Sequence, residues 1–347
     1  MSRQPRRLLL PLLLIFVVLV SSCATTPQSA ALLQQTPTKL PEAFVLADLP
    51  FFPQDDYQCG PAALATVLQA SGIAITPELL VPLVYVPKRK GSFQIEMTAA
   101  ARSQGRLVYT LAPELEALLQ EVAAGHPALI LQNLGLGMLP RWHFAVVKGF
   151  DLARKRLLLN SGRIENYEIS LATFERTWAR ADYWAQVVLP PDEVPVTAAA
   201  LPFFTAVVAL EQTGQPDAAM QAYDAGLQRW PEDQHLLMGA GNLHYAQGDS
   251  YDALVLFTRV VELYPDFAPA HNNAAQLHHE RGDATQALLH ARRAVDIGGE
   301  FAEVYRATLE QLELEWPGAA TQVPTTESSP ASTPAPTQTP ARALNPR

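Results

Sequence analysis

The chain has 347 residues, 48% hydrophobic and 17% charged, which suffices for two domains with their own cores and excludes a wholly disordered or fibrous protein. Its formal net charge of −9 makes it a poor general binder of nucleic acid or of an anionic lipid surface. The sequence contains two cysteines, Cys23 and Cys59, so a fold stapled by several disulfides is excluded as well.

Residues 1–22 have the pattern of a secretory signal peptide. Three arginines precede an apolar run over 8–20, which is shorter than the roughly 20 residues of a membrane-spanning helix. The small residues before Cys23 resemble the lipobox of bacterial lipoproteins, which implies that the Cys23 thiol is lipidated. Ala24 then implies sorting to the outer membrane, with the chain facing the periplasm. The alternative is an ordinary secreted protein with an incidental cysteine at the cleavage site.

Residues 23–43 are rich in Thr, Gln, Ala and Pro and show neither helical nor strand periodicity, which predicts a flexible spacer. From 44 to 192, helical patterns alternate with short apolar runs, as expected of an α+β domain. The helices are expected over 60–70, 114–124 and 171–179, and the strands over 128–134, 144–150, 156–160 and 184–189.

A repeat occupies residues 198–316. Glycine recurs every 34 residues at 214, 248 and 282, and alanine recurs at the same interval at 219, 253 and 287. This period resembles the tetratricopeptide repeat, which implies helix pairs stacked into an all-α solenoid, with 300–316 as a capping helix. A non-repetitive helical bundle is the alternative. The tail over 317–347 is rich in Pro, Thr and Ser and is predicted to be disordered.

A candidate nucleophile stands in the segment Gln-x4-Cys-Gly-Pro-Ala-Ala-Leu, which begins at Gln54. Cys59 directly precedes a predicted helix, whose N-terminus is expected to lower the thiol pKa and favour the thiolate. Gly60 is expected to let a substrate carbonyl approach the backbone. The Gln54 amide and the backbone N–H of Cys59 form a candidate oxyanion hole. The alternative is a buried structural cysteine.

A thiol nucleophile needs a base and a group that orients the base. Six of the eight histidines lie in the repeats, and His126 stands in a turn before Pro127, whereas His143 begins an apolar strand that would hold it rigidly. If the strands over 144–150 and 156–160 form a hairpin, Asn160 lies near His143. Its side-chain oxygen is then expected to accept the imidazole N–H.

These motifs, with His-Phe-x-Val-Val-x-Gly and Asn-Ser-Gly after the cysteine segment, resemble the papain-like bacteriocin-processing (double-glycine leader) peptidase family. The branch they resemble is the stand-alone lipoprotein form with C-terminal tetratricopeptide repeats. The resemblance implies an α+β papain-like cysteine peptidase domain with Cys59 as nucleophile and His143 as general base and acid. Asn160 would orient the imidazole and Gln54 would donate to the oxyanion. Asn160 stands where exporter-type members usually carry Asp.

The sequence therefore predicts a membrane-anchored periplasmic cysteine peptidase that cleaves peptide bonds and uses its repeats to bind a protein partner or substrate. Two alternatives remain: a catalytically silent peptide-binding adaptor of the cell envelope, and an amidase or acyl transferase that uses the same site. No cofactor, metal or nucleic acid is expected. The adjacent pair His278-His279 is interpreted as a solvated helix face rather than a metal site.

Overall fold

The structure is a computed structural model that describes residues 26–320 apart from 36, 38–39 and 54–58. The predicted signal peptide, Cys23 and Gln54 therefore lie outside the described residues, as does most of the tail. The chain divides into two compact units between Leu256 and Phe257, within the sequence of helix α11 (Ser250–Leu263). No helix in the described part is both long and apolar enough to span a membrane.

The first unit is built on a seven-stranded sheet in which every paired strand is antiparallel. The strand order is β2-β7-β3-β4-β5-β6, and the short β1 pairs with the end of β4. The strands are β1 (Ala43–Val45), β2 (Leu107–Thr110), β3 (Ala128–Asn133), β4 (Trp142–Asp151), β5 (Arg156–Ser161), β6 (Ile164–Ser170) and β7 (Ala185–Leu189). The expected hairpin is present as β4 and β5, with Val146 opposite Asn160.

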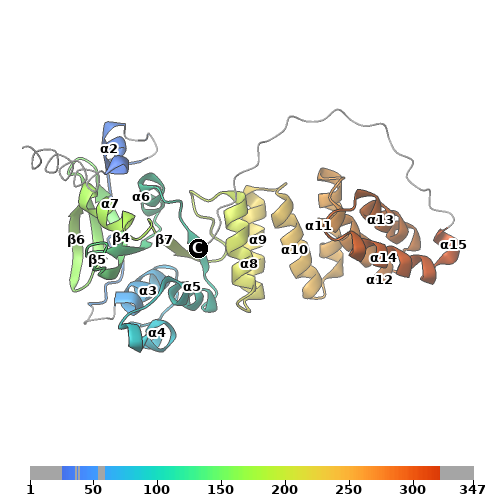
Figure 1. Cartoon of the computed structure of the whole chain (residues 1–347), viewed down its shortest axis with the longest axis horizontal. Coiled ribbons are helices and arrows are strands. Elements are labelled where there is room, and N and C mark those ends of the chain that lie inside the picture. The colour runs from blue at the N-terminus through green and yellow to red at the C-terminus, as the bar shows by residue number, and fades with distance from the viewer. Residues whose placement is uncertain (1–25, 36, 38–39, 54–58, 321–347) are drawn as a thin grey trace, which may run out of the picture. The chain divides into compact units, whose positions relative to one another are not determined.

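Helices cover both faces of this sheet (Figure 1). They are α2 (Pro27–Gln34), α3 (Cys59–Ala70), α4 (Pro77–Val84), α5 (Gln94–Ser103), α6 (Leu115–Ala123) and α7 (Leu171–Ala179), with a short 3-10 helix at Pro87–Arg89. Side chains alternate along β4, so Phe144 and Val146 pack with α3, while Ala145 and Val147 pack in the core on the opposite face. This sandwich is the expected α+β arrangement.

Residues 23–43 were predicted to form a flexible spacer, but the structure places helix α2 within this segment. The Glu175 carboxylate, almost wholly buried, accepts from the backbone N–H of Gln28 at 3.0 Å and of Ser29 at 2.7 Å. These are unpaired donors of the first helical turn, where a negative charge is favourable. A partner distant in sequence thus orders a segment without periodicity of its own.

The repeats form antiparallel helix pairs, as predicted. The helices are α8 (Ala200–Glu211), α9 (Pro216–Arg229), α10 (Gln234–Ala246), α11, α12 (Ala268–Glu280) and α13 (Ala284–Ile297), followed by α14 (Ala302–Glu315) and α15 (Pro317–Ala320). Gly214, Gly248 and Gly282 lie between paired helices with positive φ, a conformation that glycine adopts without strain. The alanines at 219, 253 and 287 are fully buried, as small residues at a close helix contact should be.

Within the first unit, one hydrophobic core runs from the sheet into the first repeat helices, where Phe203 and Tyr223 are fully buried. A polar network fixes the connecting segment before α8. The buried carboxylate of Glu121 accepts from the N–H and the hydroxyl of Thr197, both at 2.6 Å, and from the His126 imidazole. From α9, Arg229 donates to two backbone carbonyls of the same segment.

Candidate active site

Cys59 is the first residue of α3 and forms no disulfide. Pro61 lies in the first helical turn, where its missing N–H leaves no hydrogen bond unmade. A Cβ added to Gly60 would collide with the Ser92 hydroxyl, and this close approach explains the glycine. Ser92 therefore fills the space where a Cβ of residue 60 would stand, and the approach of a substrate carbonyl to this backbone stays a prediction.

The protonation state of the Cys59 thiol differs from the prediction. Burial raises its pKa, and the backbone groups of Phe144, Gly60 and Cys59 that hydrogen-bond to the sulfur only partly oppose this. Desolvation of the thiolate outweighs these hydrogen bonds. The resting sulfur is therefore a protonated thiol at neutral pH, whereas the sequence predicted a thiolate.

His143 lies near the start of β4 and is half-buried. Its Nε2 lies 2.8 Å from the Ser161 hydroxyl oxygen at the end of β5. Burial lowers the imidazole pKa to about 4, and the positive charge of Arg141 contributes to the shift. The imidazole is therefore neutral at pH 7, with Ser161 fixing the direction of its Nε2 side.

Asn160 is buried in β5, but it does not contact His143 as predicted. Its Nδ2 donates to the carbonyl of Pro50 at 3.2 Å, and its Oδ1 is buried with no hydrogen-bond partner among the described residues. The β4–β5 register sets Asn160 opposite Val146, which lies on the α3 side of the sheet. Sequence reasoning missed Ser161, although the motif Asn-Ser-Gly contains it. Neighbouring residues of a strand point to opposite faces, and only the strand register shows which of the two faces the imidazole.

The geometry brings Cys59 close to the strand that carries His143. The sulfur hydrogen-bonds to the backbone of Phe144, the residue that directly follows His143. Within the described part of the chain, the sulfur and the imidazole are not hydrogen-bonded to each other. The Cys59–His143 pair therefore stays a prediction.

Large apolar side chains are exposed on the loop that precedes His143 in the chain. The loop between β3 and β4 contains Leu136, Met138 and Leu139, whose exposed fractions are 70%, 95% and 75%, and Trp142 directly precedes His143. Exposed apolar side chains grouped on one loop are typical of a surface that binds another molecule.

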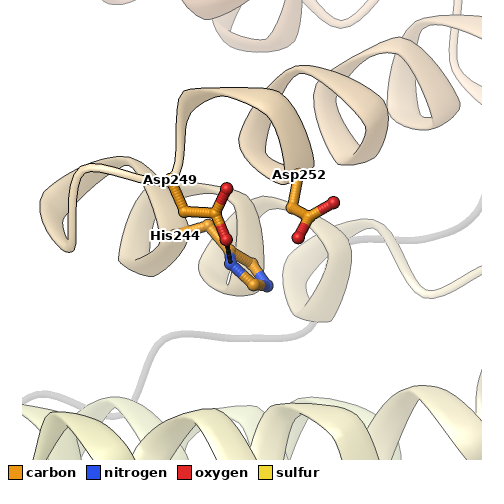
Figure 2. A group of neighbouring side chains, drawn as sticks. All are labelled: His244, Asp249 and Asp252. Carbon is orange, nitrogen blue, oxygen red and sulfur yellow. Dashed lines mark ion pairs between the residues drawn. The ribbon is translucent and has the colours of Figure 1, made fainter.

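Metal-ligating side chains gather elsewhere. Among the described residues, the group of three that could hold an ion is His244, Asp249 and Asp252, at the turn between α10 and α11 (Figure 2). It lies in the repeats, separate from Cys59 and His143 in the fold.

Comparisons with known proteins agree with the two parts of the chain. Residues 46–185 match the Peptidase_C39 like family, and residues 204–257 and 238–300 match the tetratricopeptide repeat. A solved C39-like peptidase from Bacillus anthracis is 17% identical and covers 43% of this chain and 98% of its own, with a TM-score of 0.38. The Yersinia enterocolitica type III secretion translocator chaperone SycD is 17% identical and covers 33% of this chain and 82% of its own, with a TM-score of 0.31. No curated protein matches the chain.

Proposed function

We propose, because the chain carries a C39-like peptidase domain followed by tetratricopeptide repeats, that it is a cysteine peptidase whose repeats bind a protein or peptide partner. The observation that carries the proposal is the placement of the Cys59 sulfur at the N-terminus of α3, hydrogen-bonded to the backbone of the residue after His143. A nucleophile at a helix N-terminus and a base on the adjoining strand are the two parts that acyl transfer by a thiol requires.

In this mechanism the sulfur and the imidazole both begin neutral. The Cys59 sulfur attacks the peptide carbonyl carbon while His143 removes the thiol proton, and the carbonyl oxygen becomes an oxyanion. Backbone N–H groups at the start of α3, together with the predicted donor Gln54, stabilise the oxyanion. His143 then protonates the leaving amine, which leaves a thioester on Cys59. It next activates a water molecule that releases the acid and restores the thiol.

Ser161 supplies the orientation that the sequence assigned to Asn160. If Nε2–H donates to the Ser161 hydroxyl oxygen, the lone pair stays on Nδ1, which is the nitrogen left to accept the thiol proton. The exposed apolar side chains at 136, 138 and 139 favour peptides with large apolar residues near the cleaved bond.

A peptide mixture incubated with the full chain and analysed by mass spectrometry tests the activity. We expect new peptide termini with the wild type, none with Cys59→Ala, and a rate lowered by at least about a hundredfold with His143→Ala. Folding of both variants is checked by circular dichroism. Cleavage that persists in Cys59→Ala contradicts the proposal.

A peptide-binding adaptor without turnover is the second candidate. The absence of a hydrogen bond between the Cys59 sulfur and His143 in the described residues favours it. In that case peptides bind equally to the wild type and to Cys59→Ala, and neither protein cleaves them.

The proposed location is the cell envelope, with the chain anchored through a lipid on Cys23 and facing the periplasm. The support is the sequence of residues 1–24 alone. In a bacterial host, we expect the wild type in the membrane fraction and Cys23→Ala in the soluble fraction. Equal distribution of the two proteins contradicts a lipid anchor.

A further inference from the structure

Three side chains converge at the turn between α10 and α11. Figure 2 shows the carboxylates of Asp249 and Asp252 beside the imidazole of His244. One nitrogen or oxygen from each residue lies within 4.8 Å of the other two. His244 is half-buried and both aspartates are exposed, so the group combines a fixed imidazole with carboxylates that are open to solvent.

The spacing of this group is compatible with metal ligation. His244 Nδ1 and Asp249 Oδ2 are 3.4 Å apart, which is longer than an ordinary N–H···O hydrogen bond. Ligand atoms about 2.0–2.2 Å from a tetrahedral zinc ion lie about 3.4 Å from one another. Among the described residues, Asp252 has no ion-pair or hydrogen-bond partner, so its carboxylate is available to bind an ion beside His244.

Comparison with the next repeat shows which residues of this group recur in the repeat and which do not. At the corresponding positions, His278 Nδ1 and Asp283 Oδ2 are 3.6 Å apart, so the histidine–aspartate pair belongs to the repeat. The position that corresponds to Asp252 is Gln286, which supplies no carboxylate. The Asp283 side chain caps α13 by accepting from the Gln286 N–H. Asp252 lies in the first turn of α11, and its carboxylate is the part of this group that the next repeat does not share.

We propose that His244, Asp249 and Asp252 form a binding site for a divalent transition-metal ion such as Zn²⁺. One imidazole and two carboxylates are ligands that zinc accepts, whereas Ca²⁺ and Mg²⁺ prefer oxygen ligands alone. Because the aspartates are exposed, water completes the coordination. The ion neutralises the paired carboxylates and links the end of α10 to the start of α11.

Calorimetric titration with Zn²⁺ tests this site in the full chain. Cys59, and Cys23 in protein that carries no lipid, are first blocked with iodoacetamide, because free thiols bind zinc. We expect one ion per chain with the wild type and an affinity weakened at least about tenfold in Asp252→Asn and in His244→Gln. The matched control is Asp283→Asn, which breaks the corresponding pair in the next repeat and should leave the affinity unchanged.

Thermal unfolding gives a second measurement. Zn²⁺ should raise the midpoint of the wild type and of Asp283→Asn but not that of Asp252→Asn, since a ligand stabilises only the fold that binds it. Equal zinc affinity in Asp252→Asn and the wild type overturns the proposal, as does the absence of binding at about 1 mM Zn²⁺. If Asp252→Asn does not fold by circular dichroism, Asp252→Ser takes its place.

Discussion

At the scale of single residues, the protonation of Cys59 decides how the proposed chemistry begins. Burial raises the thiol pKa above its ordinary value of 9.0, so less than about 1% of the sulfur is thiolate at pH 7. We therefore expect the rate of Cys59 alkylation by iodoacetamide to rise about tenfold per pH unit from pH 6 to pH 9. Mass spectrometry of the labelled cysteine peptide measures this rate. A plateau between pH 5 and 8 would instead reveal a preformed thiolate–imidazolium pair.

The neighbours Asn160 and Ser161 can be distinguished by their effect on His143. If the Ser161 hydroxyl accepts from Nε2–H, it also stabilises the imidazolium, so its removal should lower the His143 pKa further. We expect Ser161→Ala to reduce kcat about tenfold and to shift the acidic limb of the kcat/KM profile to lower pH, with Ser161→Thr restoring both.

Asn160→Ala is the control for that experiment. Its side chain bonds to Pro50 rather than to His143, so this variant should lose stability without moving the acidic limb. The opposite outcome, a shifted limb in Asn160→Ala alone, returns the orienting role to Asn160.

At the scale of elements, Glu121 joins α6 to the segment that leads into the repeats. Burial opposes the ionisation of Glu121, but hydrogen bonds from His126 and Thr197 outweigh burial and lower its pKa. The His126 pKa is raised in turn, because its contacts with Glu121 and Glu193 outweigh its own burial. Both shifts favour the ion-paired form of the network, in which removing one partner leaves an unpaired buried charge.

We expect Glu121→Ala to lower the free energy of unfolding by about 3 kcal/mol. The control is Glu116→Ala on the same helix, where an exposed side chain bonds to Gln120 and its loss should cost less than about 0.5 kcal/mol. Urea denaturation followed by circular dichroism measures both variants. Similar losses in the two would show that the network contributes nothing to stability.

At the scale of the whole molecule, the second unit contains an acid-sensitive histidine cluster. His290 Nδ1 lies 3.0 Å from His271 Nδ1, and the His290 ring stacks on the His278 ring at a centroid distance of 5.5 Å. The pKa values of all three are lowered by burial, that of His290 to about 4. Asp283 beside His278 and Asp266 near His271 offset part of the effect, whereas Arg281 and Arg293 reinforce it.

The stability of this unit should fall with acid. Between the unfolded pKa of 6.5 and the folded value of about 4, only the unfolded chain binds the proton of His290, so unfolding becomes easier by at most about 3 kcal/mol. Above pH 6.5 no such loss occurs. We expect His290→Leu, which matches Leu256 in the preceding repeat, to show a smaller drop in unfolding midpoint between pH 7 and pH 5 than the wild type, by calorimetry. An acid shift equal to that of the wild type contradicts this assignment.

Much of the architecture could be predicted from local patterns. The recurrence of glycine and alanine every 34 residues predicted the helix pairs. Each repeat needs a glycine at the turn between its helices and an alanine where the helices pack closely. Apolar runs predicted β3, β4, β5 and β7 to within two residues at each end. The exposed strand β6 and the ordering of α2 were not predicted, because β6 has no buried apolar face and α2 depends on Glu175, which is distant in sequence.

Some features of the candidate site could likewise be predicted from local sequence, and others could not. The sequence by itself determined where a thiol meets a helix N-terminus and which histidine begins an apolar strand, since both are local properties of the chain. Tertiary structure alone decided that the thiol is protonated and that Ser161 rather than Asn160 contacts the imidazole. It also decided that Asp252 stands beside His244. Desolvation, strand register and helix packing set these features, and each arises between segments that meet only after folding.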